Sequence, residues 1–319
     1  MQAIEVTGYG GRDQLRLGKP TRPRCKKGEV QVEVKAAGVN ALDWRIREGH
    51  FRDLFDIEFP WVPGCDMAGV VTRVGKGVSR FRKGDKVFGF VNPPMDSQPG
   101  RGTYAEYVSV PEEFLAKKPI QLSYAAAASI PLPALTAWQL LREHAGVSQG
   151  EKVLIHGGAG GVGGFTVQLA SYMGAWVLAT ASEPNHDYVL DLGADEVIDY
   201  TRTDFVDAVR RRYPQGVDVI IDTIGGETLR RSLDVIRPTG RILSVADPAL
   251  AAELDGSSVI PHFVTARPDG QTLEKLAAMF DENLLDTSIT ATFPLEEAAQ
   301  AQDLSQQGHG RGRIVLTLE

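Results

Sequence analysis

The sequence feature that most constrains the fold is a glycine-rich stretch at residues 152–174, KVLIHGGAGGVGGFTVQLASYMG. It begins with a short apolar run, long enough for one buried parallel strand. The six residues that follow the G-x-G-x-x-G spacing are Gly158, Ala159, Gly160, Gly161, Val162 and Gly163. Apolar residues then recur at the spacing of one helical face as far as Met173. The stretch therefore predicts a strand, a tight glycine turn and an amphipathic helix.

A glycine turn between a strand and a helix suits a dinucleotide. Glycine lets the backbone turn sharply and approach a pyrophosphate closely. The helix that follows points its first N–H groups and the positive end of its dipole at the phosphates. We therefore interpret the stretch as a dinucleotide site. The alternative is a glycine-rich turn that only joins two packed elements.

The composition excludes several classes of function. The chain has 319 residues, of which 43% are hydrophobic and 24% charged, and this length predicts about two globular domains. A net charge of −7 without a like-charged block argues against nucleic acid and an anionic membrane as partners. The two cysteines, Cys25 and Cys65, are too few for a disulfide framework. No signal-peptide pattern is visible, and Pro131 and Pro133 interrupt the longest apolar region, so we expect a soluble, cytoplasmic protein.

Residues 1–120 have the pattern of a β-rich domain. Short apolar or β-branched runs alternate with glycine turns and predict strands at 2–7, 30–37, 67–74, 87–91 and 104–110. Strands at this spacing indicate a sandwich or a barrel-like domain. The run 92–102 is rich in proline and glycine and is predicted to be a mobile loop.

The pattern changes after residue 122. Ser123 is a plausible N-cap for an alanine-rich helix, and residues 133–144 predict a second helix. Strands and helices then alternate, which predicts a parallel sheet with crossover helices. Its strands are expected at 153–156, 176–180, 196–198, 217–222 and 241–245. Helices at 271–283 and 296–306 precede a last strand at 313–318; because a lone strand needs a partner sheet, we place it on the first domain.

Several short runs, spread from one end of the chain to the other, resemble a known family. The runs are 37–44 (AGVNALDW), 63–69 (PGCDMAG), 102–108 (GTYAEYV), 130–138 (IPLPALTAW), the glycine turn and 309–316 (HGRGRIVL). With them the chain resembles the zinc-free, zeta-crystallin-like quinone-oxidoreductase branch of the medium-chain dehydrogenase/reductase superfamily. The resemblance implies an α/β fold with a GroES-like β-rich catalytic domain, residues 1–122 and 262–319. It also implies a Rossmann domain with a doubly wound parallel sheet, residues 123–261, and a homodimer.

The same resemblance bears on metal binding. In zinc-dependent relatives a cysteine would stand at Asn40 and a Gly-His-Glu run at Gly64-Cys65-Asp66. The four-cysteine lobe of a structural zinc is also missing, since the chain has two cysteines in total. Cys65 with Asp66 leaves a partial metal site as the alternative to a buried thiol beside a structural carboxylate. We expect no metal.

The resemblance implies hydride transfer from a nicotinamide cofactor to an acceptor that spreads negative charge, either a quinone or an α,β-unsaturated carbonyl. Asn40 and Asp43 are the candidate catalytic residues, with the Asn40 amide, a backbone N–H or water as the donor to the developing oxygen charge. Asn40 could instead be a turn asparagine bonded to its own backbone. Trp44, Arg45 and Phe51 are candidates for the substrate pocket, although Trp44 also suits the core. Arg45 and Phe51 stand where quinone-active relatives often carry tyrosines.

The candidate cofactor residues follow predicted strands or come from the resemblance. Besides Asn40 and the glycine turn they are Thr136, Ser182, Tyr200, Ile224, Ser244, Val245, Ala246, Phe263, Val264, Arg311 and Arg313. Thr136 could instead be a helix-surface or capping hydroxyl. Ile224 and Val245 could be plain core residues. Arg311 and Arg313 could be surface charges beside the last strand. Before the turn, His156 is expected to be buried and hydrogen-bonded.

The choice between NADPH and NADH depends on the end of the second strand of the parallel sheet. An acidic residue there would hold the ribose hydroxyls of NAD, whereas Ala181 and Ser182 leave room for a 2′-phosphate. Relatives that prefer NADP usually place Lys or Arg one or two residues later; here Glu183 would oppose a phosphate. Neutral neighbours, by resemblance, are Asn185, His186 and Tyr200. We expect NADPH, with NADH possible.

We therefore predict an NADPH-dependent quinone or enone oxidoreductase that needs no zinc. One alternative is an enoyl or alkene reductase that acts on a bulkier biosynthetic substrate. The other is a nucleotide-binding protein with little turnover, since no indispensable catalytic side chain is visible. Tight cofactor binding without reduction of any acceptor would favour this second alternative.

Overall fold

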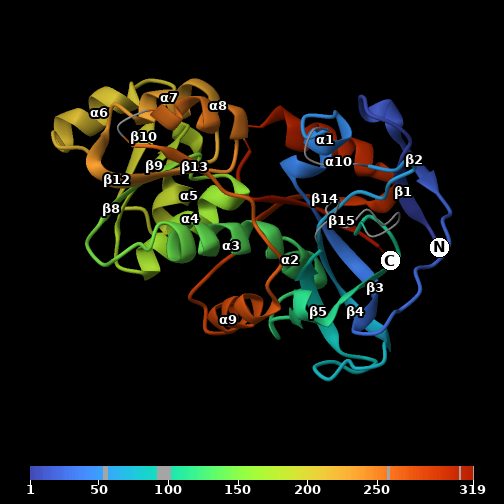
Figure 1. Cartoon of the computed structure of the whole chain (residues 1–319). Helices are drawn as coiled ribbons and strands as arrows, with labels where there is room; N and C mark the ends of the chain where they lie inside the picture. The colour runs from blue at the N-terminus through green and yellow to red at the C-terminus, as the bar shows by residue number, and fades with distance from the viewer. Residues whose placement is uncertain (53–56, 92–101, 257–258, 309, 319) are drawn as a thin grey trace. The chain divides into compact units, whose positions relative to one another are not determined.

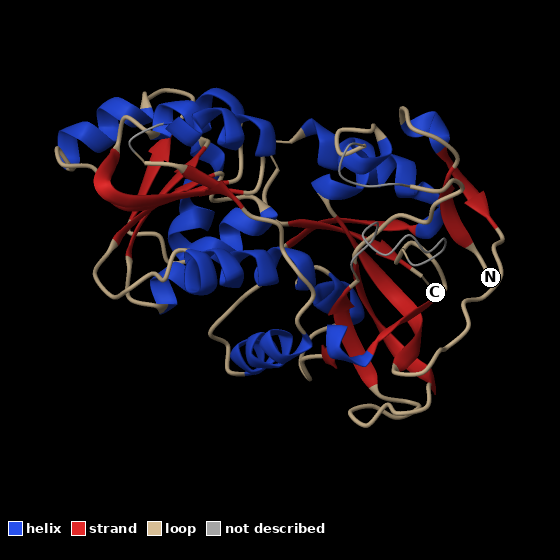
Figure 2. Ribbon diagram, viewed as in Figure 1, coloured by secondary structure: helices blue, strands red, loops and turns tan. Residues whose placement is uncertain are grey.

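The computed structural model describes residues 1–52, 57–91, 102–256, 259–308 and 310–318 (Figure 1). Residues 92–101 of the predicted loop lie outside this part of the chain. The chain divides into two compact units, which we call the first unit (Met1–Leu135 and Arg267–Glu319) and the second unit (Thr136–Ala266). Figure 2 shows strands and helices in both units, and the predicted α/β fold is confirmed.

The first unit is built on a seven-stranded sheet with the strand order β14-β15-β3-β4-β5-β7, in which β6 also pairs with β3. Its strands are β3 (Glu29–Val39), β4 (Asp66–Val74), β5 (Lys86–Phe90), β6 (Tyr107–Pro111), β7 (Leu115–Lys117), β14 (Ile289–Pro294) and β15 (Arg313–Thr317). A separate hairpin pairs β1 (Ala3–Val6) with β2 (Leu15–Gly18). The strand predicted at 104–110 begins later, at Tyr107, because Ala105 makes only an isolated bridge to Ala3.

Strand β3 forms the centre of the first core. Its alternate residues Val30, Val32 and Val34 are buried, since successive strand side chains point to opposite faces of a sheet. They belong to one apolar cluster with Val71 of β4 and Leu316 of β15. The helices of this unit are α1 (Ala41–Arg47), α2 (Tyr124–Ala128), α9 (Gly270–Asp281) and α10 (Ala298–Gln307), with 3-10 turns at Arg12–Gln14, Glu112–Phe114 and Leu295–Glu297.

The last strand returns to the first unit, as predicted. Strand β15 lies between β14, to which it is parallel, and β3, to which it is antiparallel. Its register places Ile314 opposite Val39 and Thr317 opposite Ala36. This pairing brings Arg313 beside the end of β3, where helix α1 begins.

The second unit contains a six-stranded parallel sheet with the strand order β10-β9-β8-β11-β12-β13. Its strands are β8 (Lys152–His156), β9 (Trp176–Ala181), β10 (Glu196–Asp199), β11 (Val217–Asp222), β12 (Ile236–Ser244) and β13 (Pro261–Phe263). The first strand lies near the middle and the order reverses beside it, between β8 and β11. This is the doubly wound arrangement that the resemblance implies, and the sheet is parallel, as the alternating pattern predicts.

Helices cover both faces of this sheet. Figure 1 shows α6, α7 and α8 on one face and α4 and α5 on the other. Their bounds are α4 (Gly161–Tyr172), α5 (His186–Asp191), α6 (Phe205–Arg212), α7 (Gly226–Ser232) and α8 (Pro248–Glu253), with 3-10 turns at Glu183–Asn185 and Leu254–Gly256. Phe205, Leu229 and Leu250 pack from α6, α7 and α8 against Leu154 and Ile220 of the sheet. No helix in the described ranges is long and apolar enough to cross a bilayer.

The units divide at other residues than the predicted boundaries after 122 and before 262. Helix α2, with Ser123 as its N-cap as predicted, packs on β3 and β4 and so belongs to the first unit. His262 and Phe263 lie in β13, which pairs with β12 and so extends the second unit. The helix predicted from residue 133 begins earlier, as α3 (Pro131–Trp138), and continues as a π-helical turn, Gln139–His144. Proline is tolerated there because the first turn of a helix needs no intrahelical N–H donor.

Candidate functional site

The glycine turn joins strand β8 to helix α4, as the sequence predicts. Gly157 follows the strand with φ at +75°, a conformation that favours glycine, and its carbonyl oxygen accepts from the Gly160 N–H at 3.0 Å. Gly160 is the N-cap of α4, with an extended backbone at φ −74° and ψ 174°. A glycine N-cap offers no side-chain acceptor to the first N–H groups of the helix. Those groups have no partner within the helix and are suited to an anion.

The three glycines of the spacing serve different purposes. A Cβ on Gly163 would lie 2.1 Å from the Gly157 carbonyl oxygen, and one on Gly158 would lie 2.8 Å from the Ala179 Cβ. These two glycines are therefore needed for close packing of the turn on the helix and on β9. A Cβ on Gly160 would meet only the Gly157 oxygen, at 3.3 Å, so its outer side is open. An open backbone at the start of a helix fits a diphosphate.

A buried histidine holds the glycine turn in place through a chain of hydrogen bonds. Ser232 Oγ donates to the Thr228 carbonyl oxygen at 2.7 Å and so accepts from His156 Nε2, 3.1 Å away. His156 Nδ1 then accepts from Thr180 Oγ1 at 3.4 Å, and the Thr180 oxygen accepts from the Gly157 N–H at 3.1 Å. Burial lowers the pKa of His156 to about 4, which keeps the ring neutral. The expected buried, hydrogen-bonded histidine is confirmed.

Asp222 organises the next strand ends of the second unit. Its carboxylate accepts from the backbone N–H groups of Ile224 and Gly225, at 3.1 and 3.0 Å, and from Ser244 Oγ at 2.7 Å. Ser244 Oγ in turn accepts from the Ala246 N–H at 3.2 Å. The Val264 N–H donates to the Ser244 carbonyl oxygen at 2.8 Å. The structure thus brings Ile224, Ser244, Ala246 and Val264 to one edge of the sheet, as predicted.

The exposure of these residues distinguishes between their alternative interpretations. Ile224 is 54% exposed, so plain core packing is wrong for it, and Val245 is half-buried. Thr136 lies within α3 and is buried, so it is neither an N-cap nor a surface hydroxyl. Arg311 is exposed, which agrees with the surface alternative, whereas Arg313 is buried and contradicts it.

The ends of β9 and β10 lie side by side, because Ala181 pairs with Asp199. Ser182 follows β9, and its Oγ accepts from Asn185 Nδ2 at 3.1 Å. Tyr200 follows β10 and is half-exposed. The sequence analysis missed a cation here: Arg202 Nη2 lies 2.6 Å from Glu183 Oε2. The two residues are far apart in sequence, and the parallel register alone brings them together.

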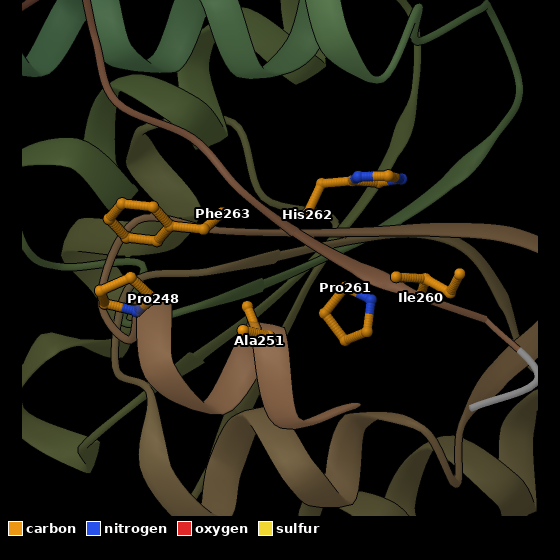
Figure 3. A pocket seen from close by; sticks show the side chains of 7 residues that line it. Pro248, Ala251, Ile260, Pro261, His262 and Phe263 are labelled. Atoms are coloured by element: carbon orange, nitrogen blue, oxygen red, sulfur yellow. The ribbon is translucent and has the colours of Figure 1, made fainter. Parts of the chain in front are cut away.

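A pocket of about 430 Å³ lies between α8 and strand β13 (Figure 3). It is lined by Pro248, Ala251 and Ala252 of α8 and by residues 260–263. Figure 3 shows Pro261 directed toward α8 and His262 directed to the other side of the strand, as the strand period requires. The lining includes Phe263, one of the predicted cofactor residues, and is otherwise mostly apolar.

The first unit gathers a cluster of buried polar side chains, which we call the Asn40 cluster: Asn40, Asp43, Asp66, Arg313, Cys65 and Tyr104. Asn40 is the N-cap of α1 and is 4% exposed. Its Nδ2 donates to Asp66 Oδ2 at 3.0 Å, and its Oδ1 accepts from Arg313 Nη2 at 2.7 Å. Its side chain thus bonds to residues far along the chain, and Asn40 also forms a capping box with Asp43, so the local role of the alternative interpretation is present as well. Three predicted residues, Asn40, Asp43 and Arg313, meet here.

Arg313 and Asp66 form the charged pair of the Asn40 cluster. Arg313 is 8% exposed; its Nη2 lies 3.3 Å from Asp66 Oδ2, and its Nε donates to the Ser129 carbonyl oxygen at 2.9 Å. Asp66 also accepts from the Leu132 N–H at 2.6 Å. Burial raises the pKa of Asp66 to about 7, while Arg313 and the hydrogen bonds act in the opposite direction.

Asp43 closes the other side of the Asn40 cluster. Its carboxylate accepts from the Asn40 N–H and from Tyr104 Oη, each at 2.8 Å, and lies 3.6 Å from Cys65 Sγ. Burial raises the pKa of Asp43 to about 6 and the pKa of the Cys65 thiol well above its usual range. Asp66 and Tyr104 were not predicted as site residues, although both lie inside the runs that carried the resemblance.

The predicted substrate-pocket residues lie on α1 and just after it. Trp44 Nε1 donates to Ser305 Oγ at 3.3 Å, and the Arg45 guanidinium carbon lies 5.4 Å from the Trp44 ring centroid. Phe51 packs against the apolar cluster that contains Ile46 and Trp61. Their contact with a substrate stays a prediction.

Metal ligation was considered for Cys65 and Asp66. Across the described ranges, no group of three or more His, Cys, Asp or Glu side chains is arranged to hold a metal ion. Cys65 lies beside Asp43, and Asp66 beside Asn40 and Arg313. The absence of zinc stays a prediction.

Comparison with known proteins extends these observations. Residues 26–120 match the family described as alcohol dehydrogenase GroES-like domain, and residues 192–316 match the family described as zinc-binding dehydrogenase. The human quinone oxidoreductase is 31% identical over 333 residues, which cover 100% of this chain and 98% of the relative. The chain belongs to the quinone-oxidoreductase family of the medium-chain dehydrogenases/reductases. It is therefore an oxidoreductase, and the predicted family is confirmed.

Two further similar proteins are informative, one found by its sequence and one by its solved structure. An Arabidopsis thaliana chloroplastic protein named NADPH-dependent alkenal/one oxidoreductase is 33% identical over 324 residues, covering 99% of this chain and 79% of the relative. The solved structure of a Coxiella burnetii quinone oxidoreductase has a TM-score of 0.90 at 32% identity and covers 100% of this chain and 99% of that one. The GroES-like and Rossmann fold classes of the two units are thereby confirmed.

Proposed function

We propose that this chain uses NADPH to reduce quinones or α,β-unsaturated carbonyls and needs no metal. The glycine turn between β8 and α4, with the open side of Gly160, carries the nucleotide part of the proposal. The names of the relatives support the rest: one is a quinone oxidoreductase and another an NADPH-dependent alkenal/one oxidoreductase. Both acceptor classes delocalise the negative charge that they gain, so their reduction does not require a Lewis acid.

The second unit would hold the nucleotide. The turn at residues 158–163 would bind the diphosphate through backbone N–H groups. Hydrogen bonds that run from the Gly157 N–H through Thr180 to His156 hold the start of the turn. The hydrogen bond between Ser244 and Asp222 holds the ends of the neighbouring strands. When bound, the nicotinamide would supply the hydride for the reduction, and the protein would supply position and electrostatics.

The first unit would contribute the polar group for the acceptor. One Nδ2 hydrogen of Asn40 is directed to Asp66, and a primary amide carries a second. We propose that this second N–H donates to the acceptor oxygen as it gains charge. Asp43 is a positioning residue in this proposal, because its buried carboxylate holds the Asn40 N–H and does not face solvent.

Cofactor absorbance is the direct test. Purified protein is mixed with NADPH or NADH and with 1,4-benzoquinone, 9,10-phenanthrenequinone or a simple enone, before and after dialysis against a strong chelator. We expect oxidation of NADPH with at least one acceptor and no effect of the chelator. Nucleotide binding without oxidation by any acceptor would favour a binding protein with little turnover. Activity restricted to an enoyl thioester would favour the enoyl or alkene reductase.

The Asn40 proposal has its own test. Asn40→Ala should lower kcat by about 100-fold, the usual effect of losing one donor to a developing oxyanion. Calorimetric binding of 2′,5′-ADP should be unchanged, which shows that the nucleotide unit is intact. An unaltered kcat would contradict a role of Asn40 in the reaction.

We also propose a homodimer and a cytoplasmic location. The first comes from the family resemblance and the second from the composition. Light scattering of the purified protein at several concentrations tests the dimer, and cell fractionation tests the location. A monomer at all concentrations would contradict the first proposal.

A further inference from the structure

The position that decides between NADPH and NADH lies at the ends of β9 and β10. In doubly wound folds an acidic residue at the end of the second strand holds the ribose hydroxyls, and a nearby arginine accommodates a 2′-phosphate. In this chain the strand ends in Ala181 and Ser182, and Glu183 follows. On sequence alone Glu183 would repel a phosphate, and no cation stands beside it.

The structure supplies the cation from the neighbouring strand. Arg202 Nη2 lies 2.6 Å from Glu183 Oε2, and Arg202 Nε lies 3.8 Å from Asp199 Oδ2. The Arg202 side chain is 67% exposed and that of Glu183 is 59% exposed. The pair therefore lies at the surface, where a ligand can reach both groups.

A tight turn fixes the backbone of Arg202. The N–H groups of Arg202 and Thr203 both donate to the Asp199 carbonyl oxygen, at 3.2 and 2.9 Å. The Asp199 carboxylate accepts from the Thr201 N–H at 3.0 Å and from Thr201 Oγ1 at 2.6 Å. Since Asp199 pairs directly with Ala181, the turn places Arg202 beside the end of β9.

We propose that Arg202 is the residue by which this chain prefers NADPH to NADH. A guanidinium has five N–H donors in a planar fork, so one edge can neutralise Glu183 while another binds a 2′-phosphate. This inference rests on the proposed use of a nicotinamide dinucleotide by the same site.

Calorimetry with nucleotide fragments tests the inference without any acceptor. The probes are 2′,5′-ADP, which carries the 2′-phosphate, and 5′-ADP, which lacks it. Arg202→Gln should weaken 2′,5′-ADP binding on the order of tenfold, the loss of one charge-assisted contact, and leave 5′-ADP binding unchanged. The wild-type preference for 2′,5′-ADP should also fall as salt is raised, because exposed charges are screened.

Two further variants sharpen the test. Glu183→Gln should strengthen 2′,5′-ADP binding a few-fold, because it removes a carboxylate and leaves Arg202 for the phosphate. Arg212→Gln is the matched control. It removes an equally exposed arginine that pairs with Glu196 at 2.7 Å, at the other end of β10. The control should bind both probes as the wild type does.

The outcomes separate this inference from the proposed function. If the wild type prefers 2′,5′-ADP and Arg202→Gln keeps that preference in full, the role of Arg202 is wrong while NADPH use stands. If the wild type prefers 5′-ADP and Glu183→Gln weakens the binding of 5′-ADP, Glu183 binds the ribose and the inference is overturned. If neither probe binds, the proposed function itself fails.

Discussion

The two units place their candidate functional groups in opposite environments. The Asn40 cluster of the first unit consists of buried side chains, among them two carboxyl groups and a guanidinium. The proposed nucleotide site of the second unit consists of backbone at a glycine turn, with exposed side chains such as Glu183 and Arg202 after the strand ends. The first site depends on each of its members for charge balance. The second site depends on which strands lie side by side, and one of its side chains can be changed without affecting the others.

This difference teaches where a change is tolerated. Removing one member of a buried charged pair leaves a group without compensation, whereas removing one exposed charge leaves water in its place. We therefore expect substitutions in the Asn40 cluster to lower stability, in addition to the effect of Asn40 on the reaction, and substitutions in the proposed nucleotide site to act mainly on binding.

The largest effect is expected for Arg313→Met. It leaves Asp66, the Asn40 carbonyl and the Ser129 carbonyl without their donor, and breaking such a pair costs about 3–5 kcal/mol. Hydrogen exchange of the β3 and β4 peptides should report the loss, while the peptides of β8 and β9 keep their protection. Asp66→Asn combined with Arg313→Met should recover part of it. Equal loss of protection in both units would contradict the expectation that the substitution destabilises only the first unit.

The pH dependence of stability should have opposite signs in the two units. The pKa values of Asp66 and Asp43 are raised to about 7 and about 6, so these groups hold protons in the folded state that the unfolded chain releases. The first unit should therefore lose stability as pH rises from about 4 to about 7. Asp66→Asn should flatten this slope.

His156 produces the opposite slope in the second unit. Its pKa is lowered from 6.5 to about 4, so the unfolded chain binds a proton that the folded chain does not. The second unit should therefore gain stability as pH rises from about 4 to about 6.5. Hydrogen exchange of the two sets of peptides, corrected for intrinsic rates, measures both slopes. His144→Gln, at an exposed histidine, is the control; a slope of the same sign in both units would refute the interpretation.

Two glycines of the turn should separate packing from binding. Gly163→Ala forces a Cβ against the Gly157 oxygen and should cost roughly 1–3 kcal/mol. Gly160→Ala meets little protein and should cost about 1 kcal/mol or less, yet it fills the side that a diphosphate would approach. We expect 5′-ADP binding to be lost in both variants, with a clear loss of stability only in Gly163→Ala. Unchanged binding in Gly160→Ala would contradict the proposed diphosphate position.

A smaller loss of stability than that of Arg313→Met is expected for Ser244→Ala. It removes a buried hydrogen bond to the Asp222 carboxylate and the acceptor of the Ala246 N–H, and should cost roughly 1.5–3 kcal/mol, because Asp222 keeps its bonds to the Ile224 and Gly225 N–H groups. Urea unfolding followed by circular dichroism measures the change. If Ser244→Ala lowered the free energy of unfolding as much as Arg313→Met does, buried polar groups would depend on their partners to the same degree in both units.

The sequence predicts the nucleotide site better than the Asn40 cluster. The glycine turn is local, since strand, turn and helix follow one another within residues 152–174, and periodicity alone identifies them. Arg202 beside Glu183 was missed because their contact depends on which strands pair. Periodicity likewise predicts most strands. The return of β15 to the first unit follows instead from the need of a lone strand for a partner sheet.

The Asn40 cluster shows the limit more clearly. Asn40, Asp66, Tyr104 and Arg313 come from four separate stretches, and only the fold brings them together. Resemblance identified Asn40, Asp43 and Arg313 as site residues. It gave no indication that Arg313 is buried or that Asp66 is its partner. Hydrophobic patterning carries no signal for a charge that is buried by a contact 247 residues away.

The position of β15 has a consequence for synthesis on the ribosome. Asp66 leaves the exit tunnel long before Arg313, its cationic partner, has been translated. The second unit, residues 136–266, is contiguous and complete in the nascent chain while the sheet around β3 still lacks β14 and β15. The first unit is thus begun before the second unit and completed after it, and its buried carboxyl groups gain their cationic partner only when β15 has been translated.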